Sequence, residues 1–184
     1  METPHRYCLG DSHISVYNPH GTIVHPTEPF VSDNLTVRNV GPILAYNTID
    51  KVDVHQYNIP DGSELILSFG EIDCRTQVYK RSKERNEAPY FIIREIADRY
   101  TNFLLSIRSR RSDLKICVLS VIPELKEFPA EVYFNKPNPD LSCLHSGSLE
   151  DRTYFKLSFN DRMKEACFNQ GFKFIDIHNQ CFDG

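Results

Sequence analysis

The chain has 184 residues, of which 40% are hydrophobic and 25% are charged, and its formal net charge at neutral pH is −4. This length allows one domain with a single sizeable core, and two domains would be cramped. The negative balance argues against a nucleic-acid partner, because neutralising phosphates needs a concentrated basic face. No apolar run approaches the roughly 18 residues that a membrane-spanning helix needs, so we expect no membrane partner.

The N-terminal residues and the cysteines indicate the cellular compartment in which we expect the protein. The first residues lack the apolar stretch of a signal peptide, and the six cysteines are dispersed without a Cys-x-x-Cys pair. We therefore expect a reduced, cytoplasmic protein without a zinc site.

Five apolar segments predict strands: residues 7–9, 35–40, 64–69, 114–122 and 172–177. The third and fourth, which contain ELILSF and LKICVLSVI, are nearly continuous apolar runs rather than alternating ones. Such runs are typical of strands that are covered on both faces in a parallel sheet.

Two long segments with helical spacing of apolar residues separate the later strands, at residues 88–111 and 148–171. The second opens with Ser148-x-x-Asp151, which predicts a capping box. The apolar stripes predict core packing rather than a cofactor site. Their members are Ile92, Ile96, Tyr100, Phe103, Ile107, Phe155, Phe159, Met163 and Ala166. The alternation of strands and helices predicts a doubly wound α/β/α sandwich.

Two irregular stretches, residues 17–30 and 123–147, follow predicted strands. Loops this long in a compact domain are usually functional or disordered. Both would lie over the carboxyl edge of the sheet, where open α/β sheets bind ligands.

Residues that could take part in catalysis follow the first three predicted strands. Gly-Asp-Ser-His occupies residues 10–13, Gly41 ends the second strand, and Gly-Glu-Ile-Asp-Cys-Arg occupies residues 70–75. Ser12 at a strand end is a candidate nucleophile, provided that a base takes its proton and donors stabilise the developing oxyanion. The alternative is turn chemistry, because Gly, Asp and Ser all favour turns.

These segments, within LGDSHISVY, RNVGP and SFGEIDCR, resemble three conserved blocks of the SGNH/GDSL hydrolases, over about residues 5–177. The family comprises serine esterases and lipases with a flavodoxin-like α/β/α fold. The combination of Gly-Asp-Ser-His with Gly-Glu-Ile-Asp-Cys-Arg resembles a subgroup of bacterial and viral members of uncertain substrate.

The resemblance implies one domain over residues 1–184, with a five-stranded parallel sheet in the order 2-1-3-4-5. It implies that Ser12 attacks an ester of a small molecule, including O-acyl groups on carbohydrates, and forms an acyl-enzyme without a cofactor. The backbone N–H groups of Ser12 and Gly41 would then form the oxyanion hole.

Two departures from the family pattern affect the expected site. Ile72 stands where the family has an oxyanion-binding Asn, and the nearest candidate substitute is Arg75. The alternative for Arg75 is a salt bridge to Glu71 or Asp73. The side chains expected to line the substrate pocket are Asp11, His13, Asp73 and Arg75.

The second departure concerns the general base. The family's C-terminal Asp-x-x-His is absent, and Asp176 and His178 are separated by only one residue. The other histidines in predicted edge loops are His13, His20, His25 and His145. No one of them is favoured as the base. We therefore expect the chain to lack its C-terminal catalytic segment, and a version extended by an Asp-x-x-His after Gly184 to be the active one.

Two other classes of function compete with the esterase. On the same scaffold, Ser12 and Arg75 could contact a ligand without chemistry, as in a carbohydrate-binding module. A metal site is a weaker alternative, because its spacing matches no known metal box. Its ligands would be Asp11, His13, Glu71 and Asp73. No Gly-x-Ser-x-Gly occurs, which argues against an α/β-hydrolase. The oligomeric state is not predicted.

Overall fold

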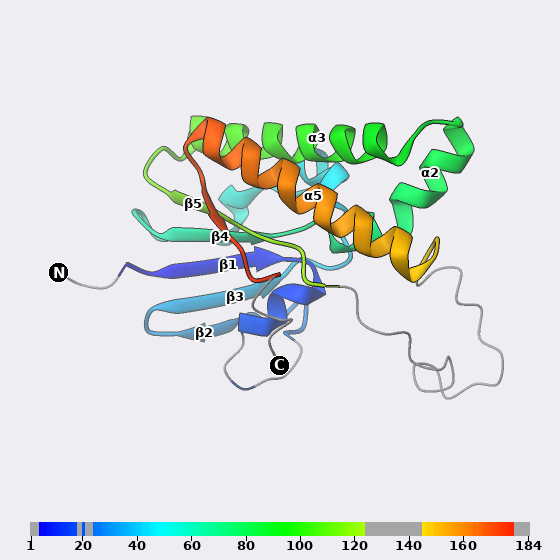
Figure 1. The fold of residues 1–184 in the computed structure, drawn as a ribbon. Coiled ribbons are helices and arrows are strands. Elements are labelled where there is room, and N and C mark those ends of the chain that lie inside the picture. Colours follow the sequence, from blue (N-terminus) through cyan, green and yellow to red (C-terminus); the bar gives the residue numbers. More distant parts are fainter. Residues whose placement is uncertain (1–3, 18–19, 21–23, 124–144, 179–184) are drawn as a thin grey trace.

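The computed structural model describes residues 4–17, 20, 24–123 and 145–178, and the fold is built around a six-stranded sheet (Figure 1). The strands are β1 (Arg6–Gly10), β2 (Phe30–Ser32), β3 (Leu35–Asn39), β4 (Glu64–Ser68), β5 (Lys115–Leu119) and β6 (Lys173–Ile175). Their order across the sheet is β2-β3-β1-β4-β5-β6.

The predicted sheet is correct in five strands and wrong in the sixth. The strands β3-β1-β4-β5-β6 are parallel and follow the predicted order. The expectation of a five-stranded, wholly parallel sheet missed β2, which pairs antiparallel with β3 so that Ser32 lies opposite Leu35. The sheet is therefore mixed. A short antiparallel edge strand on an otherwise parallel sheet is common, and its three residues lie next to a Pro-rich stretch that gave no strand signal.

The helices include both long predicted ones. The α-helices are α1 (Thr48–Lys51), α2 (Val78–Arg85), α3 (Pro89–Arg110) and α5 (Leu149–Gln170). Short helical segments are η1 (Ser12–Tyr17), η2 (Ala45–Asn47) and η3 (Val54–Tyr57), which are 3-10 helices, and η4 (Asp73–Gln77), which is a π-helix. The capping box of Ser148 and Asp151 is confirmed at the start of α5.

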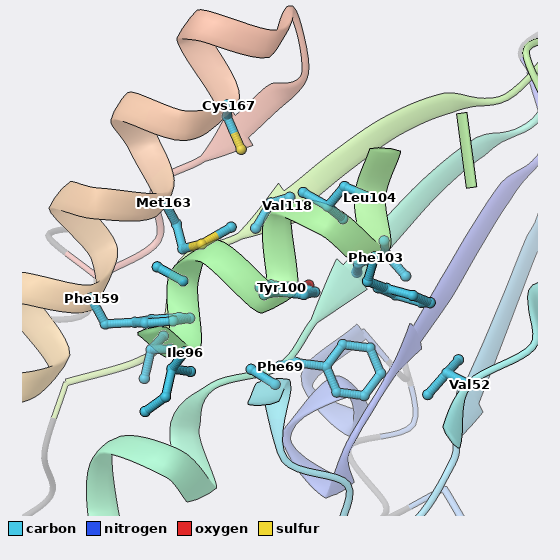
Figure 2. Packing of buried hydrophobic residues seen from close by; sticks show 14 of the residues in the cluster. Val52, Phe69, Ile96, Tyr100, Phe103, Leu104, Val118, Phe159, Met163 and Cys167 are labelled. Atoms are coloured by element: carbon cyan, nitrogen blue, oxygen red, sulfur yellow. The ribbon is translucent and has the colours of Figure 1, made fainter. Parts of the chain in front are cut away.

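The long helices α3 and α5 lie side by side on one face of the sheet (Figure 1). Their apolar stripes meet the strand residues that point to this face, as Figure 2 shows for Tyr100, Phe159 and Val118. Alternate strand residues such as Cys8 point to the other face, where they pack with Ile14 of η1. Helices thus lie on both sides of the sheet. In the part of the chain that the structure describes, the α-helices pack on one side and the 3-10 helix η1 covers the other.

The three strand ends that carry the resemblance stop at the same level of the sheet. Gly10 at the end of β1 is in register with Asn39 of β3 and with Ser68 of β4. Ser12, Gly41 and Gly70 each come two residues after one of these three residues in register, just beyond the ends of β1, β3 and β4. The close pairing requires glycine at position 10, because a Cβ there would lie 2.4 Å from the backbone oxygen of Ser68. Among the described helices, none is both long and apolar enough to cross a membrane.

Replacing Gly10 with Ala should weaken the pairing of β1 with β4. The added methyl group meets backbone rather than a flexible side chain, so we expect the free energy of unfolding to fall by about 1–3 kcal/mol. Ser32→Ala, on the exposed edge strand, should change it by less than about 0.5 kcal/mol. Urea denaturation of both variants measures this, and equal stability of Gly10→Ala and the wild type would contradict the packing argument.

Candidate functional site

Asp11 starts the short helix that carries Ser12. Its side chain is buried, and Oδ1 accepts the backbone N–H of His13 at 2.9 Å. Its backbone oxygen accepts the N–H of Ile14 at 3.1 Å. The turn chemistry that competes with a functional interpretation of Gly-Asp-Ser is therefore present, because Asp11 caps η1. Ser12 is the first residue of η1, directly beyond β1, and the position of its hydroxyl lies outside what the structure describes.

His13 lies between two carboxylates. Its Nδ1 is 2.9 Å from Asp11 Oδ1, and its Nε2 is 3.5 Å from Glu71 Oε2. Burial lowers the pKa of His13, but the hydrogen bond with Asp11 and the charge of Glu71 outweigh burial, so the pKa is raised. The two carboxylates therefore stabilise the protonated form of the ring relative to an ordinary histidine. Both ring nitrogens already face carboxylates, which argues against His13 as the general base.

Glu71 is buried and gathers three cations. Its carboxylate accepts the Nε of Arg75 at 2.9 and 3.1 Å, and Lys156 Nζ lies 3.2 Å from Oε1. Burial raises the pKa of Glu71, but Lys156, His13 and Arg75 outweigh it and lower the pKa overall. The salt bridge expected as the alternative for Arg75 is confirmed with Glu71. A contact of Arg75 with substrate stays a prediction.

Lys156 was not among the residues expected at the site. It lies on α5 one turn after Arg152, and both side chains are almost fully buried. Arg152 donates from Nη1 to the backbone oxygen of Gly147 at 2.7 Å. A signal was present in the sequence, because these two cations flank Phe155 on the stripe that was interpreted as core. Long charged side chains are almost never fully buried unless they are paired.

Asp73 is fully buried, and its carboxylate contacts the backbone of η2. Its Oδ2 accepts the backbone N–H of Ala45 at 2.6 Å, and its Oδ1 accepts that of Tyr46 at 3.3 Å. Burial raises the pKa of Asp73 to about 6, although both N–H groups act in the opposite direction. In this arrangement, Asp73 ties the end of β4 to η2, which follows β3.

The N–H of Gly41 already has an acceptor. It donates to Asn39 Oδ1 at 2.8 Å, while Asn39 Nδ2 donates to the backbone oxygen of Val24 at 2.9 Å. Gly41 has a φ of 86°, which favours glycine, and a Cβ built there would meet nothing within 4 Å. An oxyanion bound by this N–H would have to replace the bond to Asn39.

Asp176 and His178 join secondary-structure elements at the edge of the sheet. The His178 ring is buried, with Nδ1 2.9 Å from the backbone oxygen of Val121. Its backbone N–H donates to Ser120 Oγ at 3.1 Å and to Asp176 Oδ1 at 3.2 Å. Asn160 of α5 completes the junction by bonding both backbone groups of Val121. The strand that leads to His178, β6, is separated from β1 by β4 and β5.

The other candidate histidines lie in the segments before β2 and before α5. His25 is exposed and contacts Thr27 through Nδ1 at 2.8 Å. The ring of His20 packs edge-on against Phe30. His145 is half-buried, just before α5.

The four residues of the metal alternative are engaged in other contacts. Asp11 and Glu71 bond His13, and Asp73 bonds backbone N–H groups. Among the described residues, no group of three or more His, Cys, Asp or Glu side chains has the geometry to hold a metal ion.

The fold is similar to that of several solved enzymes at low sequence identity. A phospholipase A1 from Streptomyces albidoflavus NA297 is 10% identical with a TM-score of 0.53, covering 97% of this chain and 81% of that one. An extracellular lipase from Streptomyces rimosus is 13% identical with a TM-score of 0.55, covering 96% and 81%. Est24, a carbohydrate acetylesterase from Sinorhizobium meliloti, is 12% identical with a TM-score of 0.52, covering 96% and 85%.

No family model and no curated protein matches the sequence. At these identities the structural likeness shows the shared α/β fold, and it leaves the reaction to be argued from the site.

Replacing Glu71 with Gln should destabilise the protein, because it removes the charge that faces three cations. Breaking a buried ion pair leaves uncompensated charge, so we expect the free energy of unfolding at neutral pH to fall by about 3–5 kcal/mol. The pKa of Glu71 is lower in the folded protein than its ordinary value of 4.5. Its contribution is therefore fully present above pH 4.5 and is lost as the pH falls through the folded pKa.

Urea denaturation at several pH values down to about pH 3 tests this, because Glu71→Gln should remove part of the acid-dependent loss of stability seen in the wild type. The matched control is Glu84→Gln, which breaks an exposed pair with Lys80 that is 3.9 Å long. A similar small effect of both variants would show that the buried cluster does not stabilise the fold.

Proposed function

We propose that the chain is a serine hydrolase of the SGNH/GDSL type that cleaves an ester. The observation that carries the proposal is the common register line, which brings the segments after β1, β3 and β4 to one edge of the sheet. Ser12 comes two residues after the end of β1, the central one of these three strands, and Gly41 and Gly70 come at matching positions after β3 and β4. Likeness of fold to lipases and an acetylesterase supports the same interpretation.

In the proposed reaction, Ser12 Oγ attacks the ester carbonyl carbon while a base takes its proton. The tetrahedral intermediate collapses to an acyl-enzyme as the alcohol leaves with a proton. Water then attacks the acyl-enzyme and restores the serine. The N–H groups of Ser12 and Gly41 are the proposed oxyanion donors, which requires Gly41 to exchange Asn39 for the substrate oxygen.

When it is protonated, the ring of His13 adds a positive charge one residue after the proposed nucleophile. Ile72 provides no side-chain donor, and loss of one oxyanion donor typically costs about 10²–10³ in rate. The cationic groups that could offset part of that loss are the guanidinium of Arg75 and, when protonated, the ring of His13, both in contact with Glu71. We assign no general base.

The substrate class that we propose is an acyl ester of a small molecule or carbohydrate. The phospholipase, the lipase and the carbohydrate acetylesterase of similar fold are named for ester substrates that differ in both acyl and alcohol parts. An acetyl ester is therefore the simplest common probe.

The second candidate is a ligand-binding protein without catalysis on the same scaffold. Two observations favour it: the Gly41 N–H is bonded to Asn39, and Ile72 has no donor. Such a protein would bind an ester at the same edge and release it unchanged.

In a version of the protein that turns over a chromogenic acetyl ester, replacing Ser12 with Ala should abolish that turnover. Removing the nucleophile leaves only binding and electrostatic effects, so we expect kcat to fall by about 10³-fold or more. The control is Ser109→Ala, on the exposed end of α3, which should leave kcat unchanged. A fluorophosphonate probe that reacts with activated serines should label Ser12 in the wild type. Ester binding without turnover or labelling would contradict the hydrolase and support the binding protein.

A further inference from the structure

The start of η2 is held by a side chain that comes from another part of the chain. Leu44 precedes this helix and provides no side-chain hydrogen bond to it. The first two N–H groups, of Ala45 and Tyr46, instead donate to the carboxylate of Asp73, and Ala45 and Asp73 are 28 residues apart. Asp73 therefore caps η2 from the segment that follows β4.

Fixing Ala45 also restricts Gly41. Only three residues separate them, and one is Pro42, whose φ is fixed by its ring. The other end of this segment is fixed by β3, where Asn39 is the last paired residue. The segment between Asn39 and Ala45 is thus anchored at both ends, by a strand and by a buried carboxylate.

We infer that Asp73 is a positioning residue for the proposed ester hydrolysis: it holds the segment from Gly41 to Tyr46 so that the Gly41 N–H lies at the oxyanion position beside Ser12. The inference rests on the proposed function. Glu71, two positions earlier, contacts His13, which follows β1. The segment after β4 thereby contacts the segments that follow both β1 and β3.

A carboxylate suits this position better than an amide. Two N–H groups point at its two oxygens, and an Asn side chain would turn its own NH₂ toward one of them. Arg81 favours the charged form of Asp73, while burial and Asp11 oppose it. The raised pKa means that the protein takes up a proton here on folding between about pH 4 and 6, and that ionisation costs stability as the pH rises through about 6.

Because ionisation of Asp73 lowers the stability of the fold, Asp73→Asn separates an effect on stability from an effect on catalysis. The substitution removes a buried charge that opposes folding, and at the same time it removes one acceptor from η2. We therefore expect kcat for the acetyl ester to fall about 10–100-fold with KM nearly unchanged, while the protein stays folded at neutral pH. The matched control is Asp53→Asn. Asp53 is exposed and caps a different short helix, η3, by accepting the N–H of His55 at 3.1 Å, so its substitution should leave kcat unchanged.

Backbone amide NMR tests positioning without any need for turnover. In the wild type and in Ser12→Ala, the amide signals of Ala45 and Tyr46 should shift with a common midpoint near pH 6, and the Gly41 signal should move with them. In Asp73→Asn these shifts should disappear. If the amide signals shift with pH as expected but the protein hydrolyses no ester, the proposed function is contradicted while the contact of Asp73 with η2 is supported. A Gly41 amide that is unaffected by Asp73→Asn, or an unchanged kcat in that variant, would overturn the inference.

Discussion

The pairing of β1 between β3 and β4 is the constraint on which the rest of the site depends. Because Gly10, Asn39 and Ser68 lie in one register, the three segments that follow them begin at the same depth. The pairing is close enough that only glycine fits at position 10. The register of the parallel strands thus brings the three segments to the same level. Short side-chain contacts can then join segments that are distant in the sequence.

Buried charge is the second organising element. Glu71 lies among His13, Arg75 and Lys156, and removal of this buried carboxylate would leave the charge of Lys156, which is also buried, poorly compensated. Asp73, in contrast, accepts hydrogen bonds from backbone N–H groups instead of contacting side-chain cations. The two carboxylates are two residues apart but differ in pKa, lowered for Glu71 and raised for Asp73, because side-chain cations face only the first at hydrogen-bond distance.

The sequence predicted the parallel strands, the long helices and the three strand-end segments, because each depends on local patterns of apolar residues, prolines and glycines. It did not predict β2, whose three residues are too few to show a period. It did not predict the contacts of Asp73, because its partners are backbone groups of η2 that no side-chain pattern reveals, and Asp73 as a pocket residue stays a prediction. Lys156 was overlooked because a helical stripe was judged by its aromatic residues alone, and Ser12 as nucleophile stays a prediction.

The position of β1 has a consequence for how the protein is made. This strand leaves the ribosome before its partners across the sheet, which begin at Leu35 and Glu64. Its apolar residues must wait for β4 to be synthesised before both edges are paired, and contacts of such long sequence separation slow folding. Until then the nascent chain carries an unpaired, apolar strand edge, so chaperone binding and aggregation compete with folding at the strand that later leads to the site.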